Sequence, residues 1–196
     1  MIATCGLARL PATWLGQVRA GGVILANLGY ALARLTITED GGASGPFTDY
    51  AAFMRMRSDP HHTSATGRDI IEMASGRGTS ATHPFPDFLD ERPLECLRVL
   101  TDPDVVKVVR HHDHGVVHVL GDPASRSWAR ARRTSPGHAT VVHSGPRNLW
   151  AEYVRLAEFW DDHGRPPPTR LGLTVRPDGQ HVLWLDRPER PIAELP

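Results

Sequence analysis

The hydrophobic pattern of the first 57 residues predicts a run of strands. Residues 23–28 are apolar at nearly every position, which is typical of a strand covered on both faces. In residues 32–38, one set of side chains is apolar and the alternate set is mostly polar, which predicts a half-buried strand. Residues 39–42 form a turn signal, so residues 47–57 are expected to return as the second strand of an antiparallel hairpin. Residues 2–5 look like the end of an earlier strand.

A short helix is expected just before the apolar strand. Pro11 suits a first helical turn, where its missing N–H is not needed. Trp14, Leu15 and Val18 are spaced three or four apart, so one apolar face would cover the sheet. The glycine pair at 21–22 would end the helix, because glycine readily adopts a left-handed C-cap.

The composition changes at residue 58. Residues 58–86 are rich in Ser, Thr, Gly, His and Pro, and we predict a linker there. Within it, residues 69–74 are expected to form a short strand or a helical turn. Residues 94–100 are a short apolar segment whose type the pattern leaves open.

Apolar segments resume after residue 104. Residues 105–109 and 116–120 flank a histidine-rich turn, which predicts a hairpin. Residues 127–132 and 139–143 are expected to add two further strands.

The clearest helix pattern follows. Leu149, Tyr153, Leu156 and Trp160 lie four, three and four residues apart, and the prolines at 166–168 forbid continuation. A second hairpin is predicted around the Pro-Asp-Gly-Gln turn at 177–180, and the tail after Asp186 is expected to be an ordered arm or a frayed end.

Together these patterns predict an α/β protein with three parts. Residues 1–57 would form a partial sheet domain, residues 58–86 a linker, and residues 87–196 a small α+β domain. No apolar run reaches ~18 residues, so no transmembrane helix is expected, and nothing after Met1 resembles a secretory signal. The two cysteines favour free thiols in a cytosolic protein. The 22 basic and 22 acidic residues balance, so nucleic acid is not an expected partner.

Several features of the first part occur in a specific order. They are the strand end Ala3-Thr4-Cys5, the Leu10-Pro11 helix start, the segment 17–22 leading into the apolar strand, and the closing segment 53–57. In this order they resemble the C-terminal half of the catalytic domain of protein-L-isoaspartate O-methyltransferases. The resemblance implies the C-terminal half of a class I S-adenosylmethionine-dependent methyltransferase sheet.

The family binds S-adenosylmethionine through an acidic-x-Gly-x-Gly loop between a strand and a helix. The glycine-rich segment 41–45 instead joins two predicted strands, so we interpret it as a hairpin. We therefore carry over no catalytic or donor-binding residue. The expectation is a truncated carboxyl O-methyltransferase, which uses S-adenosylmethionine in the complete enzyme and binds no cofactor as this chain alone.

The C-terminal part also resembles a known extension. Its tryptophan-rich helix and the strand pair at 171–186 are similar to those of actinobacterial homologues encoded with peptide-maturation systems. That resemblance implies a protein or peptide substrate bearing aspartate or isoaspartate. The alternative is a peptide-binding module formed by residues 87–196, which could add a peptide strand to a sheet edge. A remnant without function is a third possibility.

Three residues are candidates for substrate binding. Ligands of open α/β sheets lie beyond the carboxyl ends of strands, so Thr4 and Cys5, at such an end, and Arg9, in the loop beyond it, could line an acceptor pocket. The alternative is that Thr4 caps the strand, Cys5 packs and Arg9 is solvated. Asn27, near the end of the next strand, is expected to make a turn.

The histidine-rich turn raises the question of a metal site. His111, His112, Asp113 and His114 are neighbours in a predicted turn, with His118 further along. Neighbours in a turn point in different directions, whereas a zinc site needs three or four converging ligands. A solvated hairpin tip is therefore favoured and no metal site is expected.

Overall fold

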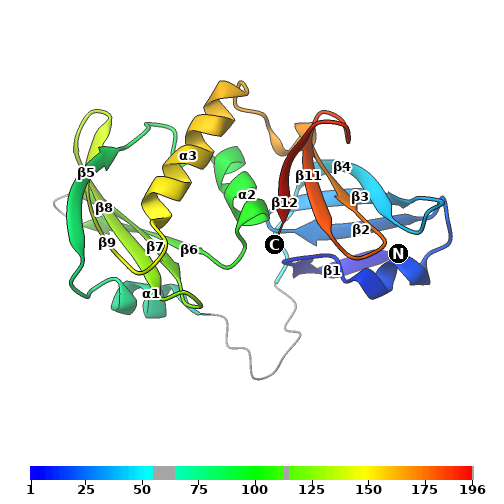
Figure 1. The fold of residues 1–196 in the computed structure, drawn as a ribbon, viewed down its shortest axis with the longest axis horizontal. Coiled ribbons are helices and arrows are strands. Elements are labelled where there is room, and N and C mark those ends of the chain that lie inside the picture. The colour runs from blue at the N-terminus through cyan, green and yellow to red at the C-terminus, as the bar shows by residue number, and fades with distance from the viewer. Residues whose placement is uncertain (55–64, 113–114, 196) are drawn as a thin grey trace. The chain divides into compact units, whose positions relative to one another are not determined.

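The computed structural model describes residues 1–54, 65–112 and 115–195 (Figure 1). The protein is α/β, with two sheets and few helices. The chain divides into two compact units. The first comprises Met1–Asp59, Glu95–Pro103 and Arg165–Pro196, and the second comprises Pro60–Leu94 and Asp104–Gly164.

A seven-stranded mixed sheet forms the first unit, in the order β1-β2-β3-β4-β10-β11-β12. Only the β1–β2 pair is parallel, and every other pair in this sheet is antiparallel. The strands are β1 (Ile2–Leu7), β2 (Val23–Leu28), β3 (Ala31–Ile37), β4 (Ala43–Tyr50), β10 (Leu171–Val175), β11 (His181–Leu185) and β12 (Pro191–Leu195).

The sequence pattern is confirmed for β2 and β3. Ile24, Ala26 and Leu28, which share one face of β2, are at most 2% exposed, whereas Val23 and Leu25 on the other face are only partly buried. The prediction of a strand holds, but full coverage of both faces does not. Strand β3 alternates between buried and more exposed positions, as predicted. The hairpin is also confirmed, but its second strand begins at Ala43 rather than at residue 47. In the tight turn the Thr38 N–H donates to the Gly42 carbonyl (2.9 Å), so β3 and β4 already pair at Ile37 and Ala43. Residues 55–57 lie outside the described residues.

The predicted helix before β2 is a 3-10 helix, η1 (Ala12–Gln17). The helix ends before Val18, which is extended, so Val18 does not join the predicted apolar face. Leu15 is the one buried residue of the helix. No side-chain cap holds its N-terminus, and so short a segment without a cap does not sustain α-helical geometry. The glycine pair at 21–22 does not end the helix as predicted, because the helix already stops at Gln17. Gly21 instead lies in the turn before β2 with a φ of +73°, a conformation that favours glycine.

The second unit is built on a five-stranded antiparallel sheet in the order β5-β9-β8-β7-β6. The predicted hairpin of β6 and β7, the two further strands and the long helix are confirmed here. The elements are α1 (Gly67–Met73), β5 (Thr79–Pro84), β6 (Val106–His112), β7 (Gly115–Asp122), β8 (Ser127–Ser135), β9 (His138–Ser144) and α3 (Leu149–Asp162).

Two helices pack on this sheet at different places. Helix α1 lies on β6 and β7, where Ile70 and Ala74 join a core with Val119 and Trp128. Helix α3 contacts β7, β8 and β9. Its Trp150 stacks on Phe85 with ring centroids 5.5 Å apart.

The predicted boundaries need correction. The stretch 58–86 is not only a linker, because it contains α1 and β5. Residues 87–196 do not form one domain either, since β10, β11 and β12 belong to the first sheet. The physical reason is that the hydrogen-bonding edge of β4 is paired by β10, with Ser44 Oγ also 2.8 Å from Thr174 Oγ1.

The remaining helices are α2 (Arg92–Thr101) and the 3-10 helix η2 (Pro168–Arg170). Residues 94–100 therefore lie within a helix. Leu94, Cys96, Leu97 and Leu100 are buried. The tail after Asp186 is ordered, because β12 pairs with β11.

Gly172 in β10 is required by the ring of Trp184. The two residues are paired across β10 and β11, and a Cβ on Gly172 would lie only 2.0 Å from the indole. Trp184 is 5% exposed and its Nε1 donates to Thr174 Oγ1 at 3.2 Å, so the ring is held in place.

We therefore expect Gly172→Ala to lower the free energy of unfolding by about 1–3 kcal/mol, because a methyl group is forced into a filled space. Chemical unfolding followed by circular dichroism measures the change. Gly16→Ala is the matched control, since nothing lies within 4 Å of its Cβ position. Equal stabilities of the two variants would contradict the argument.

Candidate functional site

The three predicted substrate-binding residues do not form a cluster at a strand end. Strand β1 continues to Leu7, so Thr4 and Cys5 lie inside the strand rather than at its carboxyl end. Thr4 is exposed and Cys5 is partly buried. Arg9 is in the following loop, partly buried and close enough to His181 to influence its pKa. The position of Arg9 agrees with the prediction, and those of Thr4 and Cys5 are corrected.

The carboxyl ends of β1 and β2 are occupied by the chain itself. Asn27 is fully buried, and its Nδ2 donates to the carbonyls of Ala51 (2.7 Å), Ala31 (3.1 Å) and Gly29 (3.3 Å). Its Oδ1 accepts from the Phe53 N–H at 3.1 Å. Asn27 therefore connects β2 to two backbone segments, 29–31 and 51–53, which is more than the turn residue predicted from the sequence.

Residues 51–54 also reach β1. The Gly6 N–H donates to the Met54 carbonyl at 2.8 Å, and a Cβ on Gly6 would lie 2.8 Å from the Phe53 carbonyl oxygen. The position where an open α/β sheet usually binds its ligand is thus filled by this segment.

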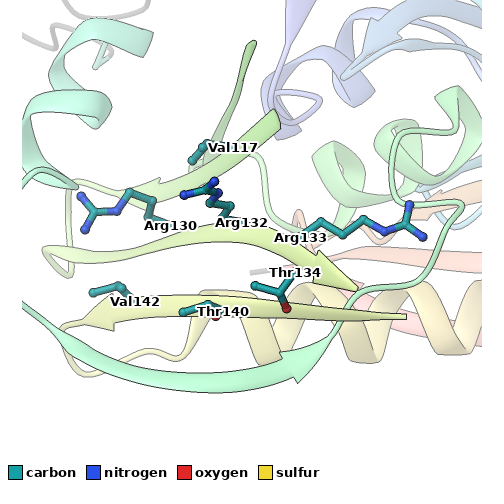
Figure 2. A pocket seen from close by; sticks show the side chains of 7 residues that line it. All are labelled: Val117, Arg130, Arg132, Arg133, Thr134, Thr140 and Val142. Carbon is teal, nitrogen blue, oxygen red and sulfur yellow. The ribbon is translucent and has the colours of Figure 1, made fainter. Parts of the chain in front are cut away.

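A second candidate site is a hollow on the five-stranded sheet, with a volume of about 500 Å³. Figure 2 shows its side chains, which come from β7, β8 and β9. They are apolar, cationic or hydroxyl-bearing, and none of the described lining residues is acidic. The lining consists of Val117, Arg130, Arg132, Arg133, Thr134, Thr140 and Val142.

Strand register explains this lining. Arg132 pairs with Val117 of β7 and with Thr140 of β9, which makes one row across the sheet. Arg130 pairs with Val119 and Val142 and makes the next row. Residues two apart on a strand share a face, so both arginines project from the face on which α1 packs. The spacing of Arg130 and Arg132 was visible in the sequence. The sequence did not show which part of the sheet face α1 would cover.

The arginines have different surroundings. Arg130 Nη1 donates to the Ala74 carbonyl at 2.8 Å, and its guanidinium lies 5.9 Å from the centre of the Trp128 ring. This partner is neutral, so the charge of Arg130 is not offset by it. Arg133 Nη2 lies 2.5 Å from Asp87 Oδ1, with both side chains well exposed, and such a surface pair contributes little stability. The hollow is therefore a cationic surface with an apolar floor.

A polar cluster of the buried Lys107, His118 and Tyr153 with the exposed Asp90 lies beneath α3. Lys107 Nζ donates to the Leu89 carbonyl (3.0 Å), Asp90 Oδ1 (3.1 Å) and Tyr153 Oη (3.0 Å). His118 is 2% exposed, with Nε2 3.5 Å from Asp90 Oδ2 and no partner for Nδ1. Burial lowers the pKa of His118, although Asp90 opposes this effect. These contacts engage all three ammonium donors of Lys107. Since Lys107 belongs to β6 and two of its partners, Leu89 and Asp90, belong to the loop before α2, the cluster ties that loop to the sheet.

The histidine-rich turn gives no metal site within the described part of the chain, where no three His, Cys, Asp or Glu side chains converge. His111 and His112 are exposed at the end of β6, while His118 points into the core. Asp113 and His114 lie outside the described residues. Helices long and apolar enough to cross a membrane are likewise absent from the described residues.

Models of known protein families, curated proteins and solved structures were compared with this chain, and none of them matches it. The candidate sites therefore rest on their own geometry.

Replacing Asn27 tests its role as a connector. Asn27→Ala leaves buried backbone groups of the 29–31 turn and of residues 51–53 without partners, and we expect a loss of about 2–3 kcal/mol in unfolding free energy. Amide exchange at Ala51 and Phe53 should also become faster. Thr48→Ala, which removes one exposed hydrogen bond, is the control and should change stability by less than about 0.5 kcal/mol. Unchanged exchange at residues 51–53 would refute the role.

His181 should make the first unit sensitive to acid. Its Nε2 accepts from the Leu10 N–H (3.0 Å) and its Nδ1 faces the Gly179 carbonyl (2.8 Å), so the buried ring is neutral with the proton on Nδ1. Burial lowers its pKa in the folded protein. The unfolded chain thus binds a proton first, and stability falls as the pH drops below about 6.5.

We expect His181→Gln to flatten this dependence, because glutamine does not titrate and can still accept from Leu10. Urea unfolding at pH values between 5 and 7.5 measures the slope. The same substitution at exposed His112 serves as control, and equal slopes for the two variants would rule out the contribution of His181.

Proposed function

We propose that the first unit is the acceptor-side part of an S-adenosylmethionine-dependent carboxyl O-methyltransferase sheet of the protein-L-isoaspartate type. The observation that supports this is the order of elements. A parallel pair, β1 and β2, is joined by η1 and followed by the antiparallel strands β3 and β4, which is the order that the resemblance of residues 1–57 implies. The substrate would be a peptide or protein that carries aspartate or isoaspartate.

The outer edge of β1 also supports the proposal. Parallel strands usually lie inside a sheet, yet β1 is an edge strand whose Ile2 is 72% exposed. Among the described residues, this edge is met at its end, where the Gly6 N–H donates to the Met54 carbonyl. An open parallel edge strand of this kind is what a further strand of a methyltransferase sheet would cover.

The described residues provide no cradle for S-adenosylmethionine. The glycine-rich segment 41–45 joins β3 to β4 and is packed against neighbouring backbone. A Cβ at Gly42 would lie 2.9 Å from the Val175 carbonyl oxygen, and one at Gly45 would lie 2.0 Å from that of Arg34. We assign no donor-binding residue and no catalytic residue to this chain.

Methyl transfer in trans tests the proposal. The protein is co-expressed with the donor-binding half of a protein-L-isoaspartate methyltransferase, and transfer of tritiated methyl groups to an isoaspartyl peptide is measured. We expect the two polypeptides to copurify and to methylate the peptide together, with neither active alone. The donor half paired with its own C-terminal half is the positive control. If that control is active while the mixed pair neither copurifies nor transfers methyl groups, the proposal is wrong.

Peptide binding by the second unit is a second candidate function. It is favoured by the arginine-lined hollow, which lies on a sheet complete within that unit. The exposed edge strand β5 offers a further place for a peptide strand. A panel of labelled peptides with different charges, titrated with the whole protein, tests this function by fluorescence anisotropy. Absence of saturable binding across the panel would exclude it.

A further inference from the structure

We infer that the arginine-lined hollow binds an acidic segment of a peptide, with carboxylates facing Arg130 and Arg132 and small apolar side chains on Val117 and Val142. The inference rests on the second candidate function and is independent of methyl transfer. It assigns a place and a chemical class to the peptide.

Charge is the first argument. Arg130 and Arg132 project from the same face of β8, and the described lining contains no carboxylate, although the whole chain is electrically neutral. Arg133 adds little to this charge, because it projects from the other face and is paired with Asp87. The positive charge is thus local. Guanidinium groups can bind carboxylates through paired hydrogen bonds. At the rim of the hollow, Arg133 already holds one carboxylate, that of Asp87, through a single contact from Nη2 to Oδ1.

The spacing of the side chains is the second argument. Arg130 and Arg132 are separated by one residue on β8 and project from the same face, so their anchor points are about 6–7 Å apart. This distance matches the separation of alternate side chains on an extended peptide. A peptide with acidic residues at positions i and i+2 would therefore meet both arginines at once.

The apolar floor decides between kinds of anion. Val117 and Val142 lie beside the arginines, and Thr134 and Thr140 add hydroxyl groups (Figure 2). A peptide presents carboxylates and apolar groups together, so it complements such a surface. Single-stranded nucleic acid requires aromatic rings on which bases stack, and the described lining has none. A volume of about 500 Å³ also exceeds what one inorganic anion fills.

The test uses the whole protein and a fluorescein-labelled octapeptide that alternates aspartate with alanine or valine. Anisotropy at low salt should show saturable binding. The same peptide with asparagine in place of aspartate should bind at least tenfold more weakly. Raising the salt from 20 to 300 mM should weaken binding several-fold, because salt screens exposed charges.

Two variants locate the binding site. Arg132→Glu reverses the charge at the centre of the hollow, and Thr140→Glu adds a negative charge opposite it without removing an arginine. We expect each to weaken binding of the aspartate peptide at least tenfold. Arg155→Glu makes the same charge change on an exposed position of α3, so it is the matched control and should alter the affinity less than twofold. Circular dichroism confirms that each variant is folded.

The outcomes separate the two claims. If the aspartate peptide binds, but all three variants weaken binding equally or none weakens it, the hollow is not the binding site. Peptide binding by the protein would then still hold. No binding of any peptide would remove the second candidate function itself. If inorganic phosphate or oligothymidylate displaces the peptide at concentrations below the Kd of the peptide, an acidic peptide is not the ligand.

Discussion

The pairing of β4 with β10 is the interaction on which the rest of the structure depends. It connects residues 43–46 with residues 172–175 and so joins two sets of strands that are far apart in the sequence. Without it, β10, β11 and β12 would have no place in the first sheet. The second unit lies entirely between these two strands in the sequence, so it is an insertion into the first unit.

The first unit combines two kinds of packing. Its centre has apolar strands, with Ile24, Ala33 and Leu35 fully buried, and hydrophobic burial of this kind is the main source of stability. The loops beside the sheet instead depend on single polar residues. Asn27 of β2 satisfies backbone groups of residues 29–31 and 51–53, and His181 of β11 holds the loop after β1. Buried polar groups of this kind are costly when a partner is lost, so they limit how this part of the sheet can change.

Local structure could be predicted from the sequence where burial leaves a periodic pattern. The apolar run of β2, the hairpin of β6 and β7, and the stripe of α3 were each visible because one or both faces are covered. Strand β5 was missed since it is an exposed edge strand of polar residues, which carries no alternation. The β4–β10 pairing was missed for another reason. Hydrogen bonds between distant strands depend on which edge is open, and no local pattern records that.

For the candidate sites too, local features could be predicted from the sequence and features that depend on distant segments could not. Arg9 was placed correctly because a loop after a strand can be read locally, whereas the role of Asn27 depends on segments 51–53 that fold back on it. The arginine pair of β8 was readable as alternate residues on a strand. That α1 covers one end of this face, where its last carbonyl accepts from Arg130, follows from tertiary packing alone. The resemblance to methyltransferases concerns residues 1–57 and does not inform the second unit.

The separation of β4 from β10 in the sequence also has a consequence during synthesis. Strands β1 to β4 leave the ribosome first, but β10 follows only after residues 51–170 have been made. Through that interval the edge of β4 is without its native partner, and open edges are where nascent chains pair wrongly. The second unit, whose strands are contiguous apart from α2, can complete its sheet within the same interval. The order of translation thus leaves the first sheet incomplete until β10, β11 and β12 have been synthesised.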